Sequence, residues 1–299
     1  MPPAPSTLTI HDLSPNLIAF YDGRTGTRFY SNEPNWVDDG GYALGIASYA
    51  IHNGASAIVY DTHLSLGHAR AIRTTLEARG VRDIRVVLSH WHLDHVAGNE
   101  IFSDCEIIAC SETLRLLKEN QSAIESGTLD GAPPINPLVL PTTIFEGDVR
   151  LDVAGLTVEL KPLDIHSRDG VALYLPHDGT LLVGDTLEDT VTYVDEPTRL
   201  AEHLEDLARL ETWQFARILP NHGSREKIMG EGYSRSLIHA TRAYVERLLR
   251  VPDDEVLQPQ DLKTFLAEPL RRGWVSYFAP YEEVHRANIA KIVAVEAAT

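Results

Sequence analysis

The stretch His90-Trp91-His92-Leu93-Asp94-His95 places three imidazoles and one carboxylate within six residues. It directly follows the apolar run from Ile84 to Leu88, which predicts a buried strand. Imidazole suits zinc and iron, and a carboxylate adds the negative charge that two adjacent cations require. We expect His90 and His92 to point toward one metal ion and Asp94 and His95 toward a second. A surface loop that happens to be rich in histidine is the alternative, because the chain has 13 histidines.

Further ligand-type residues follow other predicted strands. One predicted strand, from Leu156 to Ile165, stops at His166, and two shorter ones lead to Asp185 and His222. Asp61 follows Ala57 to Tyr60 in the same manner. A lone His or Asp after a strand is more often a turn residue than a ligand, but functional side chains gather in such loops. The recurrence at several strand ends favours a shared metal site.

On the basis of these residues, the sequence resembles the metallo-β-lactamase superfamily over about residues 7 to 225. The resemblance is carried by the HxHxDH string and by the ordered His, Asp and His downstream of it. It implies an α/β fold, a four-layer αββα sandwich with the site at one edge of the two sheets. Residues 1–225 would form the catalytic domain and residues 226–299 a helical C-terminal extension.

The resemblance also implies a role for each site residue. One metal site would consist of His90, His92 and His166, and the other of Asp94, His95 and His222, with Asp185 bridging them and Asp61 supporting a ligand from behind. Two zinc ions per chain are expected, with iron or manganese as alternatives. A hydroxide that bridges the two ions would attack the substrate, because metal binding lowers the pKa of water toward neutrality.

Catalysis would then require Asp94 to orient the hydroxide and to pass a proton to the leaving group. Most relatives have an additional donor for the developing oxyanion. Tyr193, Arg168 and Asn221 are the candidates by sequence position, and each has a structural role as its alternative. His63 either approaches the metals or sits at the entry to a helix, with contacts outside the ligand set.

Two departures from the family pattern bear on the substrate. Asp185 stands where some β-lactam hydrolases have a cysteine ligand, which favours a small ester, lactone, thioester or amide. However, His166 is followed by Ser-Arg-Asp-Gly and not by the Thr-x-Gly-His of many lactonases and thioesterases, so β-lactam hydrolysis remains an alternative. Two further alternatives for the function are a mononuclear iron oxidoreductase and a non-catalytic metal-binding protein.

Composition points to a small-molecule enzyme. With 43 acidic and 26 basic residues, the formal charge is −17, and this field repels a nucleic-acid backbone. The N-terminus has no signal-peptide pattern and no run reaches transmembrane length, so a cytoplasmic protein with no membrane partner is expected. Cys105 and Cys110 should face opposite sides of one strand and stay unpaired. A homo-oligomer is left open.

Two further segments have two interpretations each. Gly23 to Leu44 is too long for an ordinary hairpin loop, and is either a flap over the metals or a surface loop with locally packed aromatics. In the helical C-terminal region, the aromatic residues form a pocket wall or belong to the core: Trp274, Tyr277, Phe278 and Tyr281.

Overall fold

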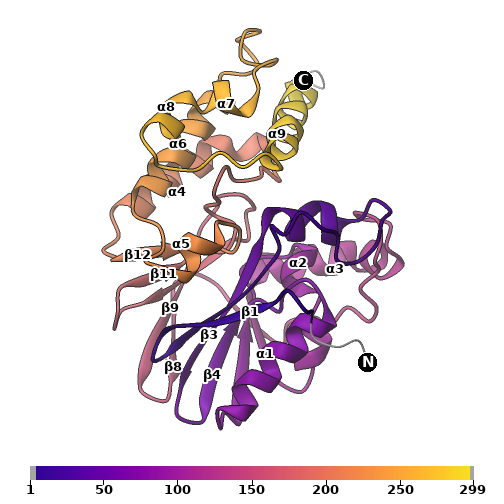
Figure 1. The fold of residues 1–299 in the computed structure, drawn as a ribbon, viewed down its shortest axis with the longest axis vertical. Helices are drawn as coiled ribbons and strands as arrows, with labels where there is room; N and C mark the ends of the chain where they lie inside the picture. Colours follow the sequence, from indigo (N-terminus) through magenta and orange to yellow (C-terminus); the bar gives the residue numbers. More distant parts are fainter. Residues whose placement is uncertain (1–4, 297–299) are drawn as a thin grey trace.

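The computed structural model describes residues 5–296 and contains two β-sheets with helices around them (Figure 1). The larger sheet has the order β1-β2-β3-β4-β5-β6-β7, with bounds Thr9–Ser14, Leu17–Asp22, Ile46–Asn53, Ser56–Tyr60, Asp83–Val87, Glu106–Cys110 and Thr143–Phe145. The smaller sheet has the order β12-β11-β10-β9-β8, with β8 Val149–Val153, β9 Leu156–Pro162, β10 Val171–Leu175, β11 Thr180–Leu182 and β12 Arg217–Leu219.

The central strands of the larger sheet are buried on both faces. In β2, alternate residues belong to two different cores: Leu17, Ala19 and Tyr21 face the smaller sheet, whereas Ile18 and Phe20 face the outer helices. Helices α1 (Leu66–Ala78) and α3 (Ser111–Ser126) cover this outer face with their apolar stripes. This two-sided burial explains why the strands are near-continuous apolar runs.

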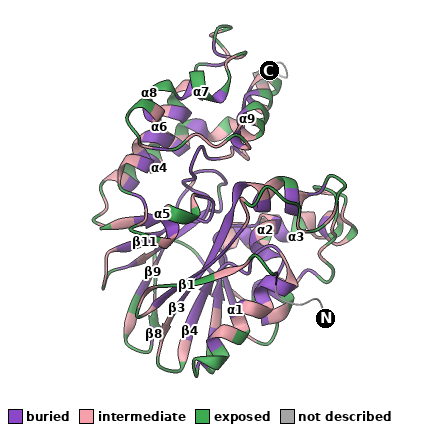
Figure 2. Ribbon diagram, viewed as in Figure 1, coloured by how far each residue is buried: buried purple, intermediate pink, exposed green. Residues whose placement is uncertain are grey.

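Helices from the second half of the chain complete the sandwich. They are α4 (Leu200–Glu211), α5 (Arg225–Met229), α6 (Ser236–Leu248), α7 (Leu262–Phe265), α8 (Ala267–Arg271) and α9 (Tyr281–Glu296). Their buried residues join the same core as the inner faces of both sheets. Figure 2 shows buried stretches on α4, α6 and α9 where they face this core. The structure is thus the expected αββα sandwich with a helical C-terminal region.

Three tyrosines of the larger sheet donate hydrogen bonds to the smaller sheet or to loops that follow its strands. Tyr21 on β2 donates to the carbonyl of Gly223 at 3.0 Å, and Tyr49 on β3 donates to the carbonyl of Pro220 at 2.6 Å. Tyr60 on β4 donates to the carbonyl of Val171. All three rings are buried, where an unpaired hydroxyl would be costly. These bonds fix the distance between the two sheets next to the loops that carry the site.

Several local expectations are confirmed, and some boundaries differ. Both N-terminal hairpins form, but β9 ends at Pro162 and residues 163–165 leave the sheet. Cys105 packs against the outer core and Cys110 belongs to the inner one, and neither forms a disulfide. Within residues 5–296, no helix combines the length and the apolar character needed to cross a membrane.

Candidate metal centre

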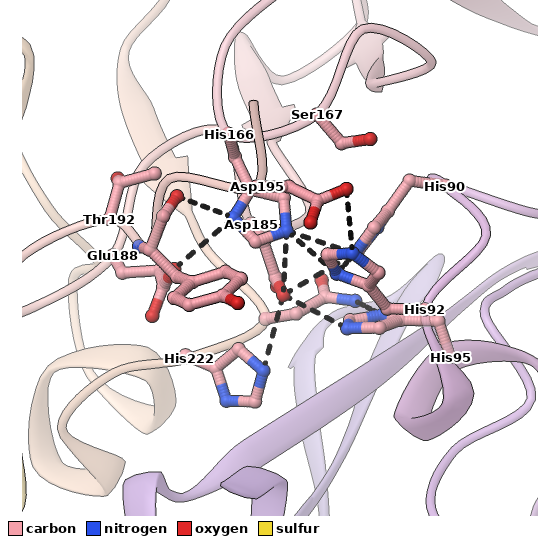
Figure 3. Close-up of polar contacts among 12 residues, drawn as sticks. His90, His92, His95, His166, Ser167, Asp185, Glu188, Thr192, Asp195 and His222 are labelled. Carbon is pink, nitrogen blue, oxygen red and sulfur yellow. Dashed lines mark hydrogen bonds and ion pairs between the residues drawn. The ribbon is translucent and has the colours of Figure 1, made fainter. Parts of the chain in front are cut away.

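All of the predicted ligands lie at the carboxyl ends of strands. The HxHxDH stretch follows β5 and includes the short helix α2 (Leu93–Val96), while His166, Asp185 and His222 follow β9, β11 and β12. β4 and β5 run parallel, as do β11 and β12, so these loops emerge at the same edge of their sheets. Figure 3 shows the side chains converging from both sheets.

Three imidazoles form the first group. His166 Nε2 lies 3.2 Å from His90 Nε2 and 3.0 Å from His92 Nδ1, and the latter two atoms are 3.0 Å apart. Nitrogen ligands in a tetrahedral zinc site, each at 2.0–2.1 Å, are separated from one another by roughly 3.3 Å. The three ring nitrogens therefore have nearly the mutual spacing that one bound ion would impose.

Two imidazoles and two carboxylates form the second group, which consists of Asp94, His95, Asp185 and His222. His222 Nε2 lies 3.1 Å from Asp94 Oδ2, and His95 Nε2 lies 3.5 Å from Asp94 Oδ1. Mixed nitrogen and oxygen donors of this kind suit zinc, iron and manganese.

Asp185 lies between the two groups. Its Oδ2 atom is 3.0 Å from His95 Nε2 and 3.3 Å from His222 Nε2 in the second group. The same oxygen is 3.6 Å from His90 Nε2 and 3.9 Å from His166 Nε2 in the first group. Its Oδ1 atom is buried without a hydrogen-bond partner among the described residues. A buried carboxylate facing four ring nitrogens fits a pair of cations better than a hydrogen-bonded network.

The ligand histidines differ in their electrostatics. Burial opposes charge on His92, but the Asp195 carboxylate outweighs it and raises the pKa of His92. Burial, together with neighbouring imidazoles, lowers the pKa of His90 well below its usual value and that of His166 to about 3. Burial also opposes charge on His95 and His222, but the adjacent carboxylates, Asp185 foremost, outweigh it and raise both pKa values. A histidine binds a metal in its neutral form, so cations in the second group would displace these protons.

A model of the metallo-beta-lactamase superfamily matches residues 41–263, about three quarters of the chain. The chain belongs to this superfamily. The match continues past residue 225, and the domain boundary expected there stays a prediction. Two named relatives and a solved structure illustrate the likeness within the superfamily.

The "Atrochrysone carboxyl ACP thioesterase" of Passalora fulva is 24% identical over 242 residues, covering 67% of this chain and 66% of that protein. The chain therefore spans slightly less than two thirds of that relative. The "Lactamase-like protein ptaB" of Pestalotiopsis fici is 26% identical over 255 residues, which are 76% of this chain and 74% of that protein. A crystal structure of VMB-1 shares the fold, with a TM-score of 0.61 and 17% sequence identity. The match covers 81% of this chain and 98% of the VMB-1 chain.

Each candidate ligand histidine has a polar partner at the ring nitrogen that faces away from the other ligand atoms. These partners fix the tautomer and the ring orientation, which metal ligands generally require. The pairs are His90 Nδ1 with Ser89 Oγ at 2.8 Å, His92 Nε2 with Asp195 Oδ2 at 3.4 Å, His95 Nδ1 with Asp61 Oδ2 at 3.0 Å, His166 Nδ1 with the Tyr193 carbonyl at 2.9 Å, and His222 Nδ1 with the Gly45 carbonyl at 3.0 Å.

Asp61 supports His95 and accepts two further hydrogen bonds from buried donors. Its Oδ1 accepts from the Ser89 amide at 2.7 Å, and its Oδ2 also accepts from Asn221 Nδ2 at 2.6 Å. Asp61 has φ +65° and His166 has φ +71°. Non-glycine residues in the left-handed region are strained, and such strain is concentrated at functional sites.

A cavity of about 570 Å³ opens over the two groups. Apolar side chains supply much of its wall: Trp36, Leu44, Trp91, Leu93, Leu129, Val284 and Ala287. Val284, Ala287 and Lys291 come from α9, so the C-terminal region forms part of the wall. Helix α9 therefore contributes to the pocket.

The segment from Gly23 to Leu44 also reaches the cavity. It contains a short π-helical stretch, Val37–Tyr42, and the residues from Trp36 to Leu44 include five that line the wall. A methyl group on Gly41 would lie 2.8 Å from Asp94 Oδ2, so only glycine allows this approach to the site. Both interpretations hold in part, because Phe29 stacks locally on Tyr42 while the segment's second half covers the metal groups.

The three candidate donors to the oxyanion occupy different positions relative to the cavity. Tyr193 lines the cavity. Asn221 is fully buried and donates to Asp61, and Arg168 pairs with Glu196 and does not line the cavity. His63 is also fully buried and stacks on His68 at 4.2 Å between ring centroids, just ahead of α1, which agrees with a helix-entry position.

The C-terminal aromatics belong to the core. Tyr281 is fully buried, while Trp274, Tyr277 and Phe278 pack against the same inner core. None of these four lines the cavity over the metal groups. The core interpretation therefore describes them.

Two residues of the site were not found from the sequence. Asp195 contacts His92, as described above. Glu188 is fully buried, accepts from the Tyr193 amide and from the Tyr281 hydroxyl, each at 3.0 Å, and lies 3.7 Å from His166 Nδ1. Burial, with the Asp185 carboxylate nearby, raises its pKa to about 8. Both lie in the irregular segment after Asp185, where no periodicity marks which side chains turn inward.

Proposed function

We propose that this protein is a dinuclear zinc-dependent hydrolase of a small ester, lactone, thioester or amide. The observation that carries the proposal is the position of Asp185 Oδ2, within 3.9 Å of two ring nitrogens in each of the two groups. A carboxylate in that place can bridge two ions, which one isolated metal site would not require. The named relatives, a thioesterase and a lactamase-like protein, support a hydrolase.

The first ion would be held by His90, His92 and His166, and the second by Asp94, His95 and His222, with Asp185 common to both. When bound, such ions lower the pKa of water from about 15.7 towards 7 and polarise the carbonyl under attack. Asp94 lines the cavity and has 16% of its side chain exposed. Its carboxylate would orient the attacking water and carry a proton to the leaving group.

Tyr193 would stabilise the oxyanion that develops on the substrate carbonyl. Its ring lies 6.3 Å from that of His92 and 5.9 Å from that of His166, on the wall of the cavity. A phenol in this place would donate a hydrogen bond to the developing oxyanion. Arg168 and Asn221 are engaged elsewhere and cannot take this role without rearrangement.

The charges on the cavity wall favour a neutral substrate. Lys291 is the single lysine or arginine among the described residues that line it, and its Nζ already contacts Asp195 Oδ1 at 3.4 Å. Asp39, Asp130 and Glu283 add acidic groups to the same wall. Penicillins and carbapenems carry a carboxylate, for which this wall offers no unpaired cation. Simple lactones and thioesters need none.

Metal content tests the dinuclear centre directly. Protein purified without added metal and dialysed against metal-free buffer should hold close to two zinc ions per chain by mass spectrometry. One iron per chain would instead support redox chemistry on this fold. A stable protein that is fully active in hydrolysis with a single metal would contradict the proposal.

Substrate preference tests the argument from wall charge. With one zinc-loaded preparation, kcat/KM for a simple lactone or thioester is expected to exceed that for a penicillin or carbapenem by at least about tenfold, which corresponds to ~1.4 kcal/mol of transition-state stabilisation. Initial rates on all four substrates provide the comparison. If a lactam proves to be the best substrate, the preference for neutral substrates is wrong.

A further inference from the structure

We propose that helix α9 holds one of the two metal sites in shape by clamping the segment Thr192–Asp195. This inference rests on metal binding by the proposed function. It concerns Asp195 and Lys291 as positioning residues, which act on the ligands and not on the substrate. The C-terminal helix would thereby determine the ligand geometry of the three-histidine site. The other site is held by residues elsewhere in the chain.

The clamped segment supplies the outer partners of two ligands. Asp195 Oδ2 lies 3.4 Å from His92 Nε2 (Figure 3). The Tyr193 carbonyl accepts from His166 Nδ1 at 2.9 Å. His92 differs from the other histidines of its group because it presents Nδ1, and not Nε2, to the neighbouring ligand atoms. A carboxylate at Nε2 holds the proton there and leaves Nδ1 free for a metal ion.

Two α9 residues one turn apart grip this segment. Asn288 is fully buried, accepts from the Val194 amide at 2.8 Å and donates to the Thr192 carbonyl at 3.1 Å. Lys291 Nζ donates to the carbonyls of Val194 at 3.2 Å and Asp195 at 3.1 Å. Positions three apart share one helix face, so both side chains reach the same stretch of backbone.

Lys291 also acts on side chains of the segment. Its Nζ lies 3.4 Å from Asp195 Oδ1 and 4.2 Å from the centre of the Tyr193 ring. One cation thus holds the carboxylate that faces His92 and the residue whose carbonyl faces His166. At the start of α9, Tyr281 donates to Glu188, which accepts from the Tyr193 amide at 3.0 Å. The helix thus contacts the segment directly through Asn288 and Lys291, and indirectly through Tyr281 by way of Glu188.

The second metal group has supports from another part of the chain. His95 contacts Asp61 after β4, and His222 contacts the Gly45 carbonyl just before β3. Neither partner belongs to the segment Thr192–Asp195. A change on α9 should therefore weaken the three-histidine site more than the site of Asp94, His95 and His222.

The test compares Lys291→Met with Arg286→Met, which removes a cation from an exposed position of the same helix. Zinc affinities of both sites are measured by competition with a chromophoric chelator. For Lys291→Met, one of the two zinc dissociation constants should rise toward the roughly 10- to 100-fold loss that removal of an outer partner itself causes. Arg286→Met should match the parent. The visible absorption of Co²⁺-substituted protein should change in Lys291→Met alone.

Asp195→Asn provides a second variant that leaves α9 intact and removes the charge facing His92. It should weaken the same single site. Parent-like affinity at both sites in Lys291→Met and Asp195→Asn would overturn the clamp, as would equal weakening of both sites. If the parent itself binds no zinc, the proposed function fails, which is a different result from a parent that binds two ions and variants that do the same.

Discussion

Replacement of His92 by alanine is expected to leave at most one metal ion per chain and to lower kcat/KM by at least about 10²-fold. His92 Nδ1 is one of three ring nitrogens within 3.2 Å of one another, so its removal leaves that group with two. Catalytic zinc sites generally use three protein ligands, and two imidazoles with a shared carboxylate hold the ion more weakly. Metal analysis after dialysis, alongside initial rates, measures both effects.

His11→Ala is the matched control, because it removes an exposed imidazole from the edge strand β1, away from the cavity. This variant should keep two metals and the parent rate. A His92→Ala protein that retained two ions and full activity would show that the three-histidine group is not a working metal site.

Much of the site could be predicted from the sequence because its ligands follow strands that are recognisable as apolar runs. β5 leads to the HxHxDH stretch and β12 leads to His222, and parallel strands bring such loops to one edge of a sheet. Asp61 was identified in the same way, and the structure places it 3.0 Å from His95 Nδ1. Here local pattern and tertiary position agree, since the strand end determines both.

The outer partners could not be predicted in this way. Asp195 meets His92 across a segment without helical or strand periodicity, and Lys291 meets Asp195 from a helix 96 residues further along the chain. Nothing in the local sequence of α9 marks Lys291 as a residue that turns toward the segment after Asp185. Such contacts are set by the packing of α9 against the sandwich, which a single sequence does not encode locally.

Tertiary packing also decides which of the three candidate oxyanion donors reaches the cavity. Tyr193, Arg168 and Asn221 all lie close in sequence to ligands or their neighbours, and side-chain direction alone decides their roles. Asn221 turns inward to Asp61, and Arg168 turns outward to Glu196. Tyr193 remains on the cavity wall because Lys291 covers its ring at 4.2 Å. Proximity in sequence was therefore a weaker guide than proximity to a strand end.

Replacement of Asp94 by asparagine is expected to lower kcat by at least about 10²-fold, the low end of what a positioned acid-base group contributes. Burial alone would raise the pKa of Asp94, but His95 and His222 lower it to about 2, so the group is an anion near neutral pH. Asparagine keeps the shape and cannot accept a proton. Stopped-flow or steady-state rates at saturating substrate measure the loss.

Stability should change little, because asparagine fills nearly the same space as aspartate and keeps one side-chain oxygen facing the second metal group. The melting temperature should stay within roughly 3 °C of the parent, equivalent to about 1 kcal/mol. Asp253→Asn, an identical change at an exposed position, is the control. A two-metal Asp94→Asn protein that stays fast would exclude Asp94 from proton transfer, whereas a slow two-metal protein separates its role in the chemistry from its role as a ligand.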